Sequence, residues 1–265
     1  MSIRVIVAGA TGWAGGAVAR ALVEDNRFTL VGAVGRRHAG ADLGRAWGRD
    51  ANGIPVAGSL VEALATPADV VVDYTHPASV KDHVMTALGA GLHVVVGTSG
   101  LNAADYAAIE ARALQAGRGV VAAGNFSLTA ALAKSFALEA ARYLGDVELV
   151  DYAAADKVDA PSGTVLELAE ALGDVVRGTE RPRAMGVPET RGAPIAGVTV
   201  HAVRLPGYVL AFEALFGKSD ERLVIRHEAG SSAAPYVAGT LLAIERVVRV
   251  TGLIRGLDRL LLADR

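Results

Sequence analysis

The chain has 265 residues, of which 52% are hydrophobic and 20% charged, as in ordinary globular proteins and unlike disordered ones. The formal net charge is -2 without any basic block, which argues against a nucleic-acid partner. The absence of cysteine excludes disulfides, thiolate metal sites and cysteine nucleophiles. Six scattered histidines have no metal-ligand spacing, so no metal site is expected. No apolar run reaches about 18 residues and the first is too short for a signal peptide, so we expect a cytoplasmic protein without membrane contact.

The first half of the sequence alternates short apolar runs with helical patterns. Runs typical of strands lie at residues 3–7, 28–34, 70–72, 93–96 and 119–122. Helical patterns lie between them at residues 17–23, 80–88 and 104–115. This alternation predicts parallel strands with right-handed crossovers. We therefore expect an α/β fold in which residues 1–126 form a Rossmann dinucleotide-binding domain.

A glycine-rich turn, Gly9-Ala10-Thr11-Gly12-Trp13-Ala14-Gly15, follows the first predicted strand. Its early glycines allow a tight turn and close approach to a pyrophosphate, and the last allows the next helix to pack close to the sheet. Glycine-rich turns are common in a chain with 31 glycines, so the position between a strand and a helix carries the prediction. The predicted cofactor contacts here are Gly9, Thr11, Gly12, Trp13 and Ala14.

The end of the second predicted strand bears on the choice of dinucleotide. A carboxylate at this point binds the ribose 2′-hydroxyl of NAD, whereas arginine accommodates the 2′-phosphate of NADP. Here Arg36 and Arg37 follow the strand, and no carboxylate occurs before Asp42. Two arginines in a loop can also be simply solvated. We hypothesise that the cofactor is NADPH, with NADH as the alternative, and that both arginines contact it.

Three more polar loops follow predicted strands, where ligands of open α/β sheets bind. They are Asp73-Tyr74-Thr75-His76-Pro77, Gly97-Thr98-Ser99-Gly100 and Gly124-Asn125-Phe126-Ser127. Any one of them could be a plain turn, but three at the same edge of the sheet predict a site. The further predicted cofactor contacts are Tyr74, Thr75, Gly97, Thr98, Ser99, Gly124, Asn125 and Phe126.

The second half has a different pattern. A helix is predicted at 128–141, a strand at 147–152, a helix at 165–172, a polar stretch at 177–194, strands at 197–205, 209–216 and 222–227, and a last helix at 236–248. Consecutive strands without helices between them predict a mostly antiparallel, open mixed sheet. We assign residues 127–234 to an α+β domain for substrate binding and oligomerisation. Residues 235–265 are expected to return to the N-terminal domain as a helical segment.

A dense polar motif, Lys157-Val158-Asp159-Ala160-Pro161-Ser162-Gly163-Thr164, immediately precedes the helix predicted at 165–172. Backbone N–H groups, a hydroxyl and a cation at a helix N-terminus favour an anion. Together with the D-[FY]-[ST]-x-P, GT[TS]G and NFS loops and the segments VHAVRLPGYVLAFEALFG and RLVIRHEA, this motif resembles the dihydrodipicolinate reductase family over nearly the whole chain. Members of that family are NAD(P)H-dependent enzymes of bacterial lysine and diaminopimelate synthesis.

The resemblance implies a reaction and a site. Hydride passes from the nicotinamide to a cyclic imine or ene-imine carboxylate such as 4-hydroxy-tetrahydrodipicolinate, and a general acid delivers a proton. Lys157 is implied as the catalytic residue of the motif, and it grips a substrate carboxylate together with Ser162, Gly163 and Thr164. Ser99 is implied in substrate as well as cofactor contact. The resemblance also implies a homotetramer with the second sheet at its centre.

One feature departs from the family pattern. Members carry a histidine pair, HHxxK, where this chain has Ala153-Ala154-Ala155-Asp156-Lys157, and a basic residue expected near 231–234 is absent. General acid catalysis contributes roughly 10²–10⁴ in rate, so an uncompensated loss should slow the family reaction. Three explanations stay open: a paralogue acting on another imine or enamine acid, a rewired reductase of the lysine pathway, and a non-catalytic NADP-binding protein.

Several other groups near the motif are candidate proton sources. Water, Tyr152 or Asp156 could replace the histidines, although Asp156 is better explained as a solvated loop carboxylate and Tyr152 could pack in the core. We expect His201 and His227 to be structural hydrogen-bonding residues in strands, and Glu213 to be fixed in the sheet.

Overall fold

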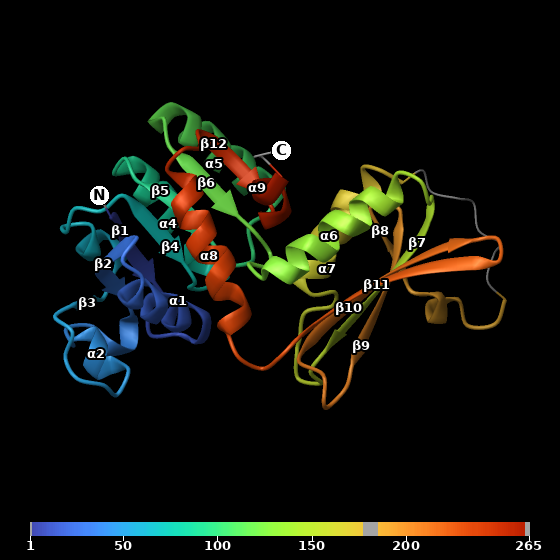
Figure 1. Ribbon diagram of the computed structural model, residues 1–265, viewed down its shortest axis with the longest axis horizontal. Coiled ribbons are helices and arrows are strands. Elements are labelled where there is room, and N and C mark those ends of the chain that lie inside the picture. The colour runs from blue at the N-terminus through green and yellow to red at the C-terminus, as the bar shows by residue number, and fades with distance from the viewer. Residues whose placement is uncertain (1, 177–184, 263–265) are drawn as a thin grey trace. The chain divides into compact units, whose positions relative to one another are not determined.

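The computed structural model describes residues 2–176 and 185–262, and these residues form two compact units (Figure 1). The first unit contains the chain up to Leu128 and the chain from Ala233 onward, and the second unit contains Thr129–Ser232. The segment after Ala233 therefore packs with the N-terminal part of the chain. Part of the polar stretch expected at 177–194 lies outside the described residues. No helix in the described ranges is long and apolar enough to cross a membrane.

The first unit is built on a parallel seven-stranded sheet with the order β12-β6-β5-β4-β1-β2-β3. Its strands are β1 (Ile3–Ala8), β2 (Phe28–Val34), β3 (Val56–Ala57), β4 (Val70–Asp73), β5 (His93–Val96), β6 (Gly119–Ala122) and β12 (Gly252–Arg255). The Rossmann-type fold is confirmed, and the three strands β2, β5 and β6 have the predicted bounds. The structure adds β3 and β12 at the two edges. Their sequences are too short to show a strand pattern.

Helices cover this sheet. They are α1 (Trp13–Glu24), α2 (Leu43–Ala46), α3 (Leu60–Ala63), α4 (Pro77–Gly89), α5 (Ala103–Ala116), α8 (Ala234–Val247) and α9 (Leu257–Leu262), with a 3₁₀ turn η1 (Arg36–His38). Residues of α3, α4 and α5, such as Val84 and Ile109, share one buried cluster with the strand residues Ile6, Val71 and Val94. Because successive strand residues point to opposite faces, and both sets are buried in β4 and β5, the sheet is covered on both faces.

The second unit is built on a mixed five-stranded sheet with the order β11-β10-β7-β9-β8. Its strands are β7 (Asp146–Ala153), β8 (Ala193–Ile195), β9 (Val198–Arg204), β10 (Leu210–Lys218) and β11 (Glu221–Ala229). Among the described strands of this second sheet, only the β7–β9 pair is parallel, so the expected open mixed sheet is confirmed. The helices are α6 (Leu128–Ala141) and α7 (Gly163–Gly173), with a 3₁₀ turn η2 (Pro188–Arg191).

The two faces of the second sheet differ. Residues of α6 and α7, such as Ala137 and Leu168, form a buried cluster with Val147, Leu149 and Phe212. Alternation along β7 therefore places Asp151 and Ala153 on the helix-covered face. It places Glu148, Val150 and Tyr152 on the opposite face.

Candidate functional site

The glycine turn after β1 has a backbone that only glycine fits. Gly9 has a φ of +85°, and its N–H donates to Val34 O at 2.9 Å. A Cβ on Gly9 would lie 2.1 Å from Tyr74 O, and one on Gly15 would lie 2.3 Å from Gly9 O. The turn is thus packed directly against both the Tyr74 loop and the first turn of α1. Two of the loops that the sequence predicted at the cofactor edge are in contact.

The N-terminus of α1 is open to an anion. Gly12 is its N-cap residue, is exposed, and no side chain caps the helix. The helix N–H groups and the positive end of the helix dipole are therefore available, which fits the pyrophosphate of a dinucleotide. Thr11 and Ala14 are half-buried, and Trp13 is 57% exposed with its ring edge-on to Tyr236, centroids 5.6 Å apart.

Trp47 also supports the turn, and the sequence did not reveal it. Its indole Nε1 donates to Ala10 O at 3.0 Å, and the Arg20 guanidinium lies over its ring at 5.5 Å. Trp47 lies 37 positions from Ala10 in the chain, so no local pattern could have shown the contact.

Arg36 and Arg37 lie in η1, directly after β2, and both are exposed. Neither forms an ion pair with another residue in the described ranges. Gly35, which precedes them, packs against Thr11, because a Cβ there would lie 2.8 Å from Thr11 Oγ1. The two arginines are thus held next to the glycine turn. Their contact with a cofactor stays a prediction.

Asp73, at the end of β4, organises two of the predicted loops. This fully buried carboxylate accepts hydrogen bonds through Oδ1 from Thr75 N at 3.1 Å, Thr75 Oγ1 at 2.8 Å and Thr98 Oγ1 at 2.5 Å. Its Oδ2 lies 2.7 Å from His83 Nδ1. Thr75 N also donates to Thr98 Oγ1 at 2.7 Å. The Thr75 and Thr98 loops are therefore fixed to each other through one side chain.

The predicted aromatic contacts are partly packed inside the unit. The Tyr74 hydroxyl hydrogen-bonds Thr240 Oγ1 at 2.7 Å, and burial raises the pKa of Tyr74. A Cβ on Gly97 would lie 2.1 Å from Tyr74 Cε1, which explains glycine at that position. The Phe126 ring is 1% exposed and lies edge-on to Tyr74 at 6.1 Å. Both rings are thus supports of the loops as well as candidate contacts.

The remaining predicted residues of the first unit lie at its surface. Ser99 and Gly124 are exposed, and Asn125 is half-buried. Asn125 Oδ1 accepts from Ser127 N at 2.8 Å and so fixes the start of that loop. Contact of Ser99 and Gly124 with a ligand stays a prediction.

In the second unit, the predicted anion motif lies at the N-terminus of α7. Ser162 is the N-cap residue: its Oγ accepts from Val165 N and donates to Asp151 Oδ1 at 2.7 Å. Ser162 N also donates to Asp151 Oδ2 at 2.7 Å. Ser162 is 2% exposed and its hydroxyl is already bonded, so its side chain shapes the turn, and its contact with a substrate stays a prediction. Gly163 and Thr164 are half-buried, and a Cβ on Gly163 would meet open space.

Lys157 lies in the loop between β7 and α7. Its backbone N–H donates to Ala154 O at 3.1 Å, and its Nζ pairs with Asp159 Oδ1 at 2.6 Å. The two side chains are 32% and 49% exposed, so this ion pair is weakly held and Lys157 can exchange its partner for a ligand carboxylate. Asp151 is paired in turn with Arg204 Nη2 at 2.8 Å, a partner that the sequence analysis did not identify.

The two histidines of the second sheet, His201 and His227, are each hydrogen-bonded to a neighbouring side chain. His201 Nε2 lies 2.8 Å from Glu148 Oε2, and His227 Nε2 lies 3.0 Å from Thr129 Oγ1, so both act as structural hydrogen-bonding residues as expected. Burial lowers the pKa of His227.

Tyr152 is also occupied, on the sheet face opposite Asp151. It contacts Tyr208, with ring centroids 5.0 Å apart, and donates to Glu213 Oε2 at 3.3 Å. Glu213 is fixed to Arg226 across the sheet, and Asp156 is exposed.

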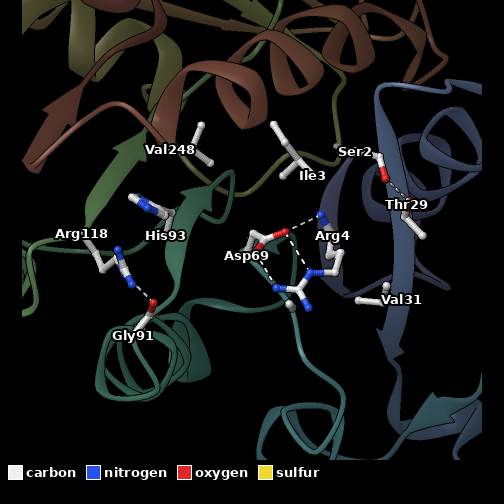
Figure 2. Close-up of a pocket in the computed structure, with 11 residues that line it drawn as sticks. Ser2, Ile3, Arg4, Thr29, Val31, Asp69, Gly91, His93, Arg118 and Val248 are labelled. Atoms are coloured by element: carbon white, nitrogen blue, oxygen red, sulfur yellow. Dashed lines mark hydrogen bonds and ion pairs between the residues drawn. The ribbon is translucent and has the colours of Figure 1, made fainter.

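A cavity of about 1050 Å³ lies in the first unit among Ile3, Arg4, Asp69, His93 and Arg118 (Figure 2). It is at the amino ends of the parallel strands and contains none of the predicted site residues. Polar groups in its lining bond to one another: Arg4 binds Asp69 through two side-chain bonds, and Arg118 Nε donates to Gly91 O at 2.5 Å. We therefore place the candidate site at the opposite edge of the sheet, where the glycine turn lies.

A Rossmann unit with an open glycine turn and a second unit with the Lys157–Thr164 motif at the N-terminus of α7 are typical of a two-domain nucleotide-dependent oxidoreductase. The sequence matches the family models for the N-terminus of dihydrodipicolinate reductase at residues 3–126 and for its C-terminus at residues 128–261. The chain belongs to the dihydrodipicolinate reductase family.

Individual relatives of this family are similar to the chain over nearly its whole length. The chain is 37% identical to the 4-hydroxy-tetrahydrodipicolinate reductase of Desulfitobacterium hafniense strain DSM 10664 and 38% identical to that of Moorella thermoacetica, with 98% of both chains covered in each case. A solved structure, the dipicolinate-bound dihydrodipicolinate reductase of Paenisporosarcina sp. TG-14, matches with a TM-score of 0.81 at 28% identity. That match covers 98% of this chain and 99% of the other.

Proposed function

We propose that this protein is an NAD(P)H-dependent reductase that acts on 4-hydroxy-tetrahydrodipicolinate in lysine and diaminopimelate biosynthesis. The observation that carries the proposal is the motif Lys157–Thr164 at the N-terminus of α7, where Asp151 fixes the turn from inside the unit. Full-length similarity to two enzymes of that name supports it. The open N-terminus of α1 supports a dinucleotide partner.

The first unit supplies the residues for the cofactor. Family members bind nicotinamide cofactors, and the uncapped turn at Gly12 suits a pyrophosphate. The Thr75 and Thr98 loops, fixed by Asp73, and the exposed Ser99 and Gly124 would hold the nicotinamide end. When bound, the reduced nicotinamide supplies the hydride. Exposed Arg36 and Arg37 after β2 favour NADPH over NADH, because guanidinium groups bind a 2′-phosphate.

The second unit supplies the residues for the substrate. Lys157 contributes a cation, and the backbone N–H groups of Gly163 and Thr164 lie at the positive end of the α7 dipole. Both favour a carboxylate. The relative from Paenisporosarcina was solved with dipicolinate bound, a dicarboxylate, which supports an anion of this class as the ligand. Binding would require Lys157 to leave Asp159.

Water is the proposed proton donor. Ala153 and Ala154 have no acidic group, Tyr152 lies on the sheet face opposite Asp151, and Asp156 is exposed in the loop. A donor supplied by solvent lacks the advantage of a positioned acid, so we expect slower turnover than in an enzyme with a histidine acid. Positioning of the hydride donor and acceptor would still contribute to the rate.

We further propose a homotetramer assembled through the second unit. The helices α6 and α7 cover one face of its sheet. The other face carries the apolar side chains of Val150, Val203, Leu215 and Val224, the last of them 49% exposed. The face also carries charged side chains such as Glu148, Glu213 and Arg226, but its exposed apolar side chains suit burial against a second copy. Light scattering should give the mass of four chains, and Val224→Glu should reduce it.

The test of the reaction is NADPH consumption with freshly generated 4-hydroxy-tetrahydrodipicolinate. We expect turnover that depends on both ligands, with a higher kcat/KM for NADPH than for NADH. Tight NADPH binding without turnover of this substrate, but with turnover of another cyclic imine acid, would replace the proposal by the paralogue that Ala153 and Ala154 leave open. Binding without any turnover would indicate a non-catalytic protein.

A further inference from the structure

Arg204, the last residue of β9, forms hydrogen bonds both to β7 and to the loop that carries Lys157. Its Nη2 donates to Asp151 Oδ2 at 2.8 Å and to Asp159 O at 2.6 Å. Its Nη1 donates to Asp151 O at 3.3 Å and to Val203 O at 2.9 Å. One guanidinium thus ties the end of β7 to the residue whose carboxylate pairs with Lys157.

Asp151 completes the connection. It is fully buried, and both of its oxygens bind Ser162, the first residue of the anion-binding turn. The Arg204 side chain is 16% exposed, so the pair is shielded from solvent. Arg204 therefore reaches the turn through Asp151 and reaches the Lys157 loop through Asp159.

The negative charge of Asp151 would affect anion binding at the Ser162 turn if Arg204 did not neutralise it. An unpaired carboxylate bonded to the first residue of an anion-binding turn would repel the ligand, because Coulomb interactions are strong where solvent is excluded. The Arg204 cation cancels the charge of Asp151. The arrangement leaves one donor unsatisfied, because Arg204 Nε is buried and has no hydrogen-bond partner among the described residues.

We propose that Arg204 and Asp151 are positioning residues for the substrate carboxylate. Arg204 neutralises Asp151 and fixes the Lys157 loop, and Asp151 fixes the turn at Ser162. The inference rests on the proposed function, in which Lys157 and the Ser162–Thr164 turn bind the carboxylate. Neither residue contacts substrate.

The experiment is calorimetric titration of the full-length protein with dipicolinate and, separately, with NADPH. Arg204→Met should raise the dipicolinate Kd roughly tenfold or more, because it leaves Asp151 buried and unpaired. The NADPH Kd should stay within about twofold, since the glycine turn lies in the other unit. Arg142→Met is the control: it removes a cation from an exposed pair with Glu139 on α6 and should change neither Kd.

A second variant separates charge from packing. Arg204→Met combined with Asp151→Asn removes the uncompensated charge and should bind dipicolinate more tightly than Arg204→Met alone. A purely structural role predicts the reverse, since the double variant loses more hydrogen bonds. Arg204→Lys keeps the charge but cannot span both acceptors, and should give an intermediate Kd.

The outcomes distinguish this inference from the proposed function. If the unaltered protein does not bind dipicolinate, or Lys157→Ala leaves its Kd unchanged, both fail. If Lys157→Ala weakens binding but Arg204→Met changes the Kd less than twofold, only the positioning role is overturned. If near-UV circular dichroism shows that Arg204→Met is not folded, Arg204→Lys decides, and a Kd unchanged from that of the unaltered protein overturns the role.

Discussion

The glycine turn of the first unit and the Ser162–Thr164 turn of the second unit, which we propose binds an anion, are shaped by different physical means. The first depends mainly on close backbone packing: Gly9 has a φ of +85°, and a Cβ there would collide with Tyr74 O. The second depends on buried charges: Asp151 binds Ser162 with both oxygens, and Arg204 neutralises Asp151. The first site should therefore be damaged by adding a methyl group, and the second by removing a charged group.

The largest effect is expected for Gly9→Ala. A non-glycine residue at positive φ costs about 1 kcal/mol, and the clash with Tyr74 O should bring the loss of unfolding free energy to about 3 kcal/mol or more. NADPH binding should be lost. Thermal unfolding and NADPH titration measure both.

Gly91→Ala is the matched control for the methyl group. Gly91 has a φ of +77°, but a Cβ there would meet no heavy atom within 4 Å. Only the backbone cost of about 1 kcal/mol should appear. Equal losses for the two variants would contradict the claim that close packing fixes the turn.

The next effect is expected for Asp73→Asn, which tests whether side chains also matter in the first unit. The amide cannot accept from all of the groups that surround Asp73, so at least one of Thr75, Thr98 and His83 loses a bond. We expect a loss of about 2 kcal/mol in unfolding free energy and a roughly tenfold higher Kd for NADPH. The dipicolinate Kd should not change.

Asp69→Asn is its control at the opposite end of the same strand. Asp69 precedes β4 and pairs with Arg4 at 2.7 Å, with both side chains more than a third exposed. The change should cost less than about 1 kcal/mol and leave the NADPH Kd unaltered. An equal effect on NADPH binding would contradict a cofactor site at the carboxyl ends of the strands.

Lys157→Ala tests the proposed carboxylate site of the second unit, because Lys157 is the residue expected to contact the substrate there. We expect the KM for the substrate to rise roughly tenfold, with the KM for NADPH unchanged. Lys218→Ala, at the exposed end of β10, removes the same side chain elsewhere in the second unit and should leave both values as they are. An unchanged substrate KM in Lys157→Ala would remove Lys157 from the site.

The smallest expected effect concerns pH and one buried histidine in each unit. Burial lowers the pKa of both His93 and His227, so the folded protein binds fewer protons there than the unfolded chain. Stability should therefore be complete above the unfolded histidine pKa of about 6.5 and should fall as the pH drops through it. His227→Asn should flatten this dependence in melting curves. A slope unchanged by the substitution would show that His227 does not contribute.

The fold could be predicted from the sequence where strands are fully buried. The runs at β2, β5 and β6 are apolar, mostly β-branched and bounded by turns, and their bounds agree with the prediction. The strand β12 begins at Gly252, which requires a φ of +90°, and has only four residues, so its pattern is invisible locally. Its place follows from pairing with β6.

In the candidate site, likewise, local sequence motifs could be predicted and contacts between distant residues could not. The motifs at Gly9–Gly15 and Lys157–Thr164 were visible because their residues are adjacent in the sequence. The contacts of Arg204 with Asp151 and of Trp47 with Ala10 join residues 53 and 37 positions apart. Such contacts arise only from strand register and helix packing. The bond from the Ser162 hydroxyl to Asp151 was likewise not visible in the sequence, because the two residues lie 11 positions apart.

The most direct test of the central claim follows the hydride itself. The protein is mixed with 4-hydroxy-tetrahydrodipicolinate and NADPH deuterated at the transferred position, and the product is analysed by mass spectrometry and NMR. The proposed reductase predicts a reduced product that carries deuterium on carbon in amounts equal to the NADPH consumed. An unlabelled product, or bound NADPH that is not consumed in the presence of this substrate, would contradict the account.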